Sequence, residues 1–326
     1  MKTEYIVRSI GTVIVGAACI LALAGCTCKG EENIPPEQHH AIDFTPHVTR
    51  AAVTSLGEGD SFAAWARKSR DGESRLILTQ EEVYCTGGVW NYDHICYWER
   101  EAVYDFYALY PHDTPNAELQ ESGTGGNPRL SVTDFDTRDG RDLMCAEQTG
   151  IRYEGSPAPV KFTFRHLLSK VEIVGRIDPA LAAGGVSARI VSAKLFGLPA
   201  TGSCTVVAGS NASWEPGAPT TADAPFRSAA ETALSTTGVS LFGELLPLPQ
   251  TIDGGVTLEI VYEYADTNHT ENRFTKTIRL ADTGLTAWEP GTGYRYGFTV
   301  GSDYILFGTP EVVPWRSASG GSVTVE

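Results

Sequence analysis

Basic residues are scarce in this sequence. Its 326 residues include 25 Lys and Arg against 40 Asp and Glu, which gives a formal net charge of −15 at pH 7. A surface that binds nucleic acid needs clustered positive charge to displace counterions from the phosphates. The charge balance therefore argues against a nucleic-acid partner, and a hydrophobic share of 42% argues against wholesale disorder.

Catalytic and metal-binding motifs are missing as well. The sequence contains no HExxH, CxxC, P-loop or GxSxG pattern, each of which places reactive groups at a fixed spacing. The seven His are scattered, and no general acid and base stand at a defined separation. We therefore expect no enzymatic activity, no catalytic residue, no bound metal and no cofactor.

Charge is also missing from residues 9–28, which follow a weakly basic start. Within this stretch, Leu23-Ala24-Gly25-Cys26 resembles the lipobox of bacterial lipoproteins, in which small residues admit the backbone to the signal peptidase and the cysteine thiol receives a diacylglycerol. We predict a signal peptide over residues 1–25, lipidation at Cys26 and a polar tether over residues 26–40. A plain secretory signal and a short transmembrane anchor are the alternatives.

From residue 41 onward, apolar and polar residues alternate in short runs. Clear examples are residues 103–110, 256–264 and 294–300, and an alternation of period two is typical of half-buried strands. Many of the 34 Gly and 18 Pro stand between such runs, and no long segment has a helical stripe. The pattern predicts an all-β fold built from sandwiches.

One segment breaks the alternation. Apolar residues occupy even positions from Val160 to Phe164 and odd positions from Leu167 to Ile173. A one-residue slip sends side chains to the opposite face of a strand, so the chain either carries a bulge here or leaves one core for another. We favour the second interpretation and place a domain boundary between residues 165 and 166.

Two cysteines flank a predicted hairpin. Export makes a disulfide feasible, and Cys85–Cys96 is the pair to test, although buried thiols in apolar strands fit the sequence equally well. Cys28, Cys145 and Cys204 stand apart. Of the seven Cys, five lie outside the signal and the lipid site, and an odd count leaves at least one unpaired within a monomer.

Several short motifs follow one another nearly from end to end of the chain. After the lipobox they are Ile42-Asp-Phe-Thr, Thr49-Arg50-Ala51, Gly59-Asp-Ser-Phe62, Val89-Trp-Asn-Tyr92, Tyr104-Asp-Phe-Tyr-Ala-Leu-Tyr-Pro111, Val160-Lys-Phe-Thr-Phe-Arg-His-Leu-Leu-Ser-Lys-Val171, Leu245-Leu-Pro-Leu-Pro-Gln250, Trp288-Glu-Pro-Gly-Thr-Gly-Tyr294 and Pro314-Trp315. Each motif alone is weak, but in this order and spacing the chain resembles the fimbrillin-like proteins of Bacteroidetes, the type V pilus subunits and their anchor and tip relatives.

The resemblance implies two tandem transthyretin-like β-sandwich domains, which correspond to residues 41–165 and 166–326. It implies a surface-exposed lipoprotein of the cell outer membrane, held by the lipid on Cys26. It also implies that a trypsin-like protease cuts after an Arg behind the first strand, which matches Arg50, with Ala51 as the new N-terminus. A strand of another fimbrillin-type subunit would then fill the groove. Other subunits, and adhesion ligands on host or bacterial surfaces, are the implied partners.

Loss of the first strand would be costly. Ile42, Phe44 and Val48 form its apolar side, and at about 1.5–3 kcal/mol each they stabilise the domain by about 5–9 kcal/mol, against roughly 5–15 kcal/mol for a whole domain. The bared edge would also be prone to aggregation, so a replacement strand must bury a similar area. We expect this donor in the C-terminal stretch, at Glu311–Trp315 or Ser322–Glu326.

A second class of function rests on aromatic residues. Trp90, Tyr92, Tyr97 and Trp98 would form a sugar-binding platform if they were exposed and coplanar, which describes a lipid-anchored surface glycan-binding protein or other adhesin that does not polymerise. Burial in a sandwich core is the competing interpretation, because these residues lie on predicted strands.

Overall fold

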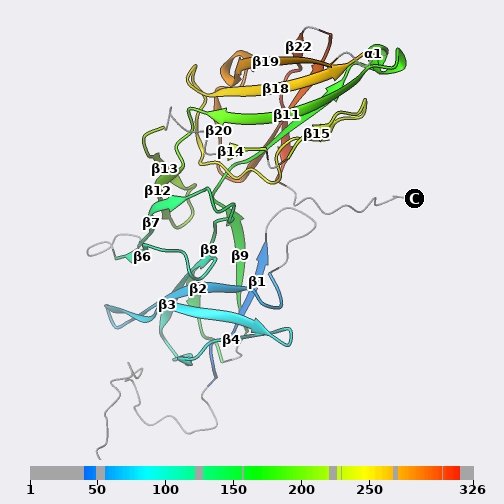
Figure 1. The fold of residues 1–326 in the computed structure, drawn as a ribbon. Coiled ribbons are helices and arrows are strands. Elements are labelled where there is room, and N and C mark those ends of the chain that lie inside the picture. The colour runs from blue at the N-terminus through cyan, green and yellow to red at the C-terminus, as the bar shows by residue number, and fades with distance from the viewer. Residues whose placement is uncertain are drawn as a thin grey trace, which may run out of the picture. The chain divides into compact units, whose positions relative to one another are not determined.

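The computed structural model describes residues 40–48, 56–121, 128–155, 158–219, 226–228, 230–266, 271–302 and 304–315. Over these residues the chain is nearly all β, which confirms the all-β prediction (Figure 1). The helical elements are short: α1 (Pro179–Ala183), whose first turn is capped by the Asp178 carboxylate, and the 3-10 turn η2 (Leu280–Thr283). No helix in this described part is long and apolar enough to cross a membrane.

The first half of the chain builds a large curled sheet. Its strands are β1 (Phe44–Val48), β2 (Ser61–Arg70), β3 (Glu73–Thr86), β4 (Val89–Asn91), β5 (Val103–Tyr110), β6 (Ala117–Gln120), β7 (Arg129–Asp136), β8 (Met144–Arg152) and β9 (Val160–His166). Seven of them form one sheet in the order β1-β9-β8-β5-β2-β3-β4. Because β1 also contacts β4 at the other end of this order, the sheet curls around an aromatic core on one of its faces.

The second half forms a sandwich. Its strands are β10 (Lys170–Ile177), β11 (Ser187–Phe196), β12 (Thr201–Val207), β13 (Ser213–Pro216), β14 (Phe226–Arg227), β15 (Thr232–Ala233), β16 (Val239–Ser240), β17 (Gln250–Thr251), β18 (Thr257–Ala265), β19 (Glu271–Arg279), β20 (Ala287–Trp288), β21 (Thr292–Val300), β22 (Ile305–Phe307) and β23 (Glu311–Pro314). One sheet has the order β16-β10-β21-β22, with β23 also paired to β21, and the other has the order β14-β11-β18-β19. Both sheets contribute to a single apolar core.

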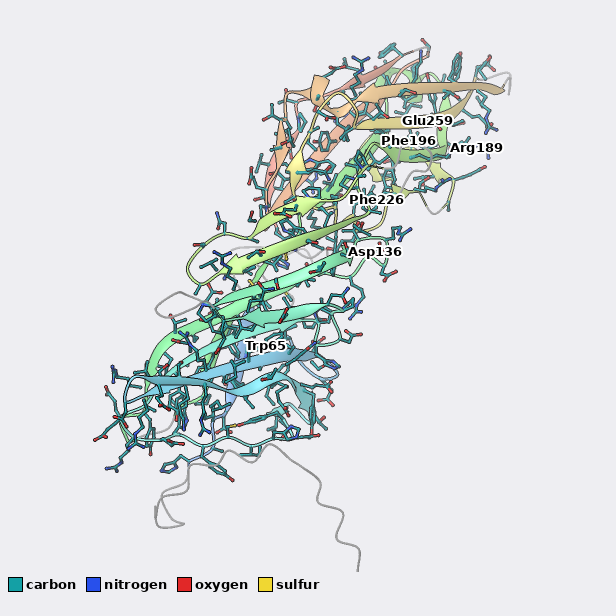
Figure 2. All side chains as sticks on the ribbon, turned by 90° about the vertical axis from the view of Figure 1, so that its left-hand side faces the viewer. Trp65, Asp136, Arg189, Phe196, Phe226 and Glu259 are labelled. Atoms are coloured by element: carbon teal, nitrogen blue, oxygen red, sulfur yellow. The ribbon has the colours of Figure 1, made fainter. Side chains whose placement is uncertain are left out.

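The hairpin β12–β13 belongs to the second half by sequence but pairs with the first half. Strand β12 lies antiparallel to β7, which completes a four-stranded sheet of order β13-β12-β7-β6. This sheet shares a core with the second face of the seven-stranded sheet. Trp65 of β2, labelled in Figure 2, belongs to this core. This residue is 2% exposed. The break predicted between residues 165 and 166 stays a prediction, and this hairpin crosses it.

The change of apolar positions after β9 has the cause that the sequence suggested. Val160 and Phe164 pack in the aromatic core of the curled sheet, Leu167 packs in the core beneath the four-stranded sheet, and Val171 packs in the core of the sandwich that the second half forms. The chain therefore passes from one core to the next within a few residues, and the interpretation that it leaves one core for another is confirmed.

Trp214 of β13 ties the hairpin to this crossing point, because its indole Nε1–H donates to the carbonyl of Leu167 at 2.8 Å. We predict that Trp214→Phe lowers the free energy of unfolding by about 1 kcal/mol, the usual net value of one such bond. Glu215→Ala, at an exposed position of the same strand, should change it by less than about 0.5 kcal/mol. Urea titrations measure both free energies of unfolding, and an equal decrease in the two variants would contradict this role of the indole.

Candidate functional site: the first strand and its groove

Residues 40–48 lie between two other segments of the chain. Strand β1 runs parallel to β9, with Phe44 opposite Val160 and Val48 opposite Phe164. Ahead of β1 the partner changes: Ala41 forms an antiparallel bridge with Tyr97. The first strand is therefore hydrogen-bonded to β9 along its second part and to the loop after β4 along its first part.

The side chains of this strand alternate between core and solvent. Ile42 is 0% and Phe44 is 4% exposed, Pro46 is also buried, His47 is exposed and Val48 is half-buried. Position 46 continues the period of two that starts at Ile42, so Pro46 belongs to this apolar face together with Val48. The apolar face of the first strand is thus centred on Phe44.

Phe44 lies in a hollow built from rings. Its ring stacks on Phe162 with centroids 5.6 Å apart and meets Tyr92, Phe106 and Phe62 edge-on at 5.3, 6.0 and 6.4 Å. Such aromatic pairs add about 0.5–1.5 kcal/mol each beyond the burial of area. The groove under the first strand is consequently an aromatic socket that fits one large apolar side chain.

The predicted sites of processing lie outside the described residues. The described residues end at Val48 and begin again at Leu56. Arg50 and Ala51 fall in this gap, and Cys26 precedes the first described residue. Lipidation at Cys26 and cleavage after Arg50 remain predictions.

The C-terminal segment is already paired within its own chain. Strand β23 lies antiparallel to β21, with Val312 opposite Tyr294. The next residue, Trp315, is 5% exposed and stacks on His166 with centroids 4.2 Å apart, and His166 Nδ1 lies 2.6 Å from Asp142 Oδ2. Of the two donor candidates, Glu311–Trp315 therefore has to leave these partners before it can act, and Ser322–Glu326 lies outside the described residues.

The fimbrillin-like family model matches residues 49–315. The chain belongs to the fimbrillin-like family. No curated protein matches the sequence.

Solved structures share the fold of this fimbrillin-like chain. A fimbrial protein of Bacteroides vulgatus is 18% identical with a TM-score of 0.55, over 78% of this chain and 92% of that one. A proposed cell adhesion protein of Bacteroides ovatus is 17% identical with a TM-score of 0.55, over 86% of this chain and 99% of that one. A third, from Bacteroides uniformis, is 18% identical with a TM-score of 0.50, over 85% and 99%. At such low identity, these likenesses show the fold alone.

The predicted Cys85–Cys96 disulfide is not formed in this fimbrillin-like chain. Both residues are buried thiols, as are Cys145 and Cys204. Cys85 of β3 lies opposite Trp90 of β4, whereas Cys96 lies beyond that hairpin and its Sγ donates to the carbonyl of Ile77 at 3.4 Å. The structure agrees with the alternative interpretation of the sequence, in which these cysteines are buried thiols among apolar residues.

The aromatic platform is not present at the four named positions. Tyr92 and Trp98 are each 6% exposed, and Trp90 is half-buried. Trp98 packs edge-on against Tyr104 with centroids 4.9 Å apart. Only Tyr97 among the four is exposed, at 46%, and the other three belong to the core around the first strand or pack against it.

A polar pocket of about 360 Å³ lies beside β2 and β5, lined in part by Arg67, Asp105, Tyr107 and Gly150. Its groups bind one another: Asp105 Oδ2 accepts from Arg67 at 2.6 Å and Oδ1 accepts from the Gly150 amide at 2.8 Å. Burial raises the pKa of Tyr107 to about 12, so its phenol stays protonated at neutral pH. Among the described residues, no group of three or more His, Cys, Asp or Glu is arranged to hold a metal ion.

The socket makes a direct prediction for stability. Phe44→Ala should lower the free energy of unfolding by about 3–5 kcal/mol, because it empties a ring-lined site. His47→Ala, at an exposed position of the same strand, should change it by less than about 0.5 kcal/mol. Denaturant unfolding of both variants checks this, and a similar loss for each would mean that Phe44 does not fill the groove.

The cysteines make a second prediction. Burial raises the pKa values of the Cys145 and Cys204 thiols to about 12, so almost no reactive thiolate exists at pH 8. We expect iodoacetamide to modify them slowly in the native protein and quickly after unfolding. Without reductant, the unfolded protein should also take up label at Cys85 and Cys96, as followed by peptide mass spectrometry. Linked Cys85 and Cys96 peptides would contradict the structure.

Proposed function

We propose that this protein is a surface-exposed outer-membrane lipoprotein that serves as a fimbrial subunit, in a structural, anchor or accessory position, and acts in cell adhesion without enzymatic activity. It assembles by donor-strand exchange with other fimbrillin-type subunits. The observation that carries the proposal is the position of residues 40–48. They contain β1, the strand at one end of the seven-stranded sheet, and this strand completes the aromatic core. Arg50 follows the last residue of β1 by two positions.

The geometry of the groove favours replacement of the first strand by another strand over loss of the first strand alone. Burial of Ile42 and Phe44 alone is worth about 3–6 kcal/mol, a large part of the roughly 5–15 kcal/mol that holds a domain together. An emptied groove would expose the Phe44 socket together with the unpaired edge of β9. A strand from a second subunit can restore both, with ladder hydrogen bonds for affinity and alternate side chains for specificity.

The test is processing by an arginine-specific protease. Wild-type protein should be cut after Arg50, as shown by intact mass, and then form multimers that survive on unboiled denaturing gels. Arg50→Ala should give neither product, whereas Arg100→Ala, at an exposed turn position, should behave as wild type.

Two outcomes would overturn the proposal. Multimers of Arg50→Ala in wild-type amount would place the processing elsewhere. Wild-type protein that is cut after Arg50 but stays monomeric would not be a polymerising subunit, and an adhesin that does not polymerise would then be favoured.

A further inference from the structure

The loop that follows β4 holds the start of the first strand. We call residues Tyr92–Trp98 the clamp. The Tyr92 hydroxyl donates to the carbonyl of Ile42 at 2.8 Å, the Ile42 amide donates to the carbonyl of Cys96 at 2.9 Å, and the Trp98 amide donates to the carbonyl of His40 at 2.9 Å. The Tyr92 hydroxyl also accepts from the Cys96 amide at 3.1 Å. The clamp thus binds residues 40–42 through its own backbone and one phenol.

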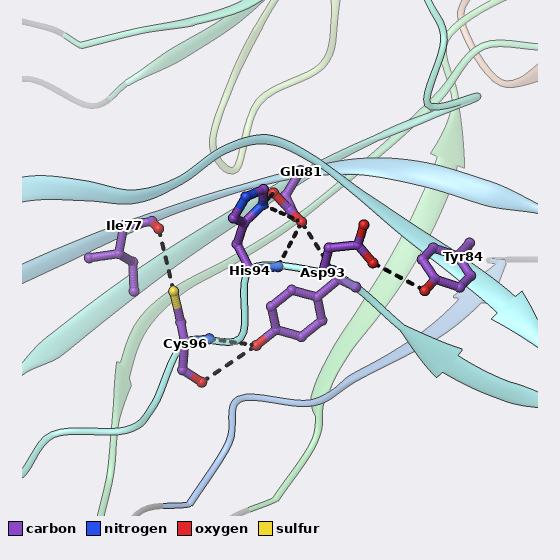
Figure 3. Close-up of polar contacts among 7 residues, drawn as sticks. Ile77, Glu81, Tyr84, Asp93, His94 and Cys96 are labelled. Carbon is purple, nitrogen blue, oxygen red and sulfur yellow. Dashed lines mark hydrogen bonds and ion pairs between the residues drawn. The ribbon is translucent and has the colours of Figure 1, made fainter. Parts of the chain in front are cut away.

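The clamp contains no helix or strand, and its regular backbone pairing is limited to the single bridge between Tyr97 and Ala41. Side-chain contacts must therefore fix its shape. The Glu81 carboxylate of β3 does this: its Oε1 accepts from the amides of Asp93 and His94 at 3.2 and 3.1 Å, and its Oε2 lies 2.8 Å from His94 Nδ1 (Figure 3). The Glu81 side chain is only 13% exposed. A carboxylate that accepts backbone amides while largely shielded from water makes strong hydrogen bonds.

The position of Glu81 depends on an irregularity in β3. The pairing of β3 with β2 shifts by one residue between Leu78 and Glu81, and Gln80 has a φ of 51°. Because of this bulge, Leu78 and Val83 both reach the aromatic core although their numbers differ in parity, and Glu81 shares the face of Val83. Bulges often re-aim a side chain at a functional position, and strained backbone persists where the surroundings require it.

We propose that Glu81 is a positioning residue that sets the rate at which the first strand leaves its groove. The inference rests on the proposed function, in which that strand is displaced after a cut behind it. Once the connection to residue 56 is cut, residues 40–48 are held by β9, by the socket and by the clamp. The clamp must open before residues 40–42 can leave, and Glu81 keeps it closed.

The experiment uses the full protein with a site-specific protease sequence in place of residues 49–55, so that the cut does not depend on Arg50. After the cut, a labelled peptide of residues 40–48 is added in excess, and its incorporation is followed over time. Glu81→Ala should speed incorporation roughly ten- to hundredfold, the effect expected from hydrogen bonds to a charged group. Glu81→Gln, which keeps an acceptor but loses the charge, should lie between Glu81→Ala and wild type.

Matched controls separate the clamp from general charge effects. Glu82→Ala and Glu82→Gln remove the same charge one residue along β3, from a side chain 46% exposed, and should incorporate peptide at the wild-type rate. His94→Ala, whose imidazole is 70% exposed but whose amide remains, should also stay close to wild type. Equal rates for the Glu81 and Glu82 variants would overturn the proposal. If Glu81→Ala does not fold, the comparison of Glu81→Gln with Glu82→Gln decides.

Hydrogen exchange in the uncut chain gives a readout that does not need strand exchange. Glu81→Ala should speed amide exchange in residues 40–48 and in the clamp, while β18 and β21, in the sandwich of the second half, keep wild-type protection. Equal acceleration everywhere would show mere destabilisation and would overturn the role of Glu81. Peptide incorporation that fails in every variant and in wild type would instead refute the proposed function, and hydrogen exchange would still decide the clamp.

Discussion

The stacking of Phe44 on Phe162, inside a ring of aromatic side chains, is the contact on which the first half of the fold depends. The rings come from β2, β5, β9 and the clamp, which the curled sheet brings around one point. With Phe44 in place, four rings have their centroids within 6.4 Å of its own, and its side chain is buried. Without it, four aromatic faces would border an empty groove, and the sheet would lose the strand that closes its curl.

Three sets of contacts hold the first strand: the ladder to β9, the socket around Phe44 and the clamp. They differ in what they recognise. The ladder to β9 uses backbone groups, so it accepts any extended segment with free amides. The socket around Phe44 selects an apolar side chain at one position, and the clamp fixes where Ile42 must lie along the groove. Register is strongly specified where one face of a strand is buried, and here the socket and the clamp specify it together.

Local patterns in the sequence predicted individual strands and the point at which the chain passes from one core to the next. Alternation identified β5 and β21, and the switch of apolar positions after Phe164 identified the passage between cores. Pairing between distant segments leaves no such trace, so the return of β12 to β7 could not be foreseen.

The candidate site shows the same limit. The sequence pointed to Ile42 and Phe44 because they alternate with polar residues. It did not indicate that Tyr92 and Glu81 act on the first strand, because their roles arise from a bulge and an irregular loop. The Cys85–Cys96 disulfide failed for a related reason: proximity in sequence suggested a bridge across a hairpin that ends before Cys96.

The groove sets requirements that a replacement strand has to meet. It needs apolar side chains two residues apart, at the positions of Ile42 and Phe44, and an amide N–H where Ile42 donates to Cys96. In Glu311–Trp315 the apolar pairs two residues apart are Val312 with Pro314 and Val313 with Trp315, and both leave an N–H at the position of Ile42. The transfer of this segment would, however, uncover β21 and pull Trp315 from His166.

Ser322–Glu326 has the required pattern of side chains and amides. Val323 and Val325 stand two residues apart between polar neighbours, and every residue of this segment carries an amide N–H. Valine is smaller than the phenylalanine it would replace, so it would fill the Phe44 socket incompletely, and part of the free energy lost with the first strand would have to come from contacts outside that socket. As a donor, Ser322–Glu326 would therefore bind more weakly than the strand it replaces unless flanking residues also contribute.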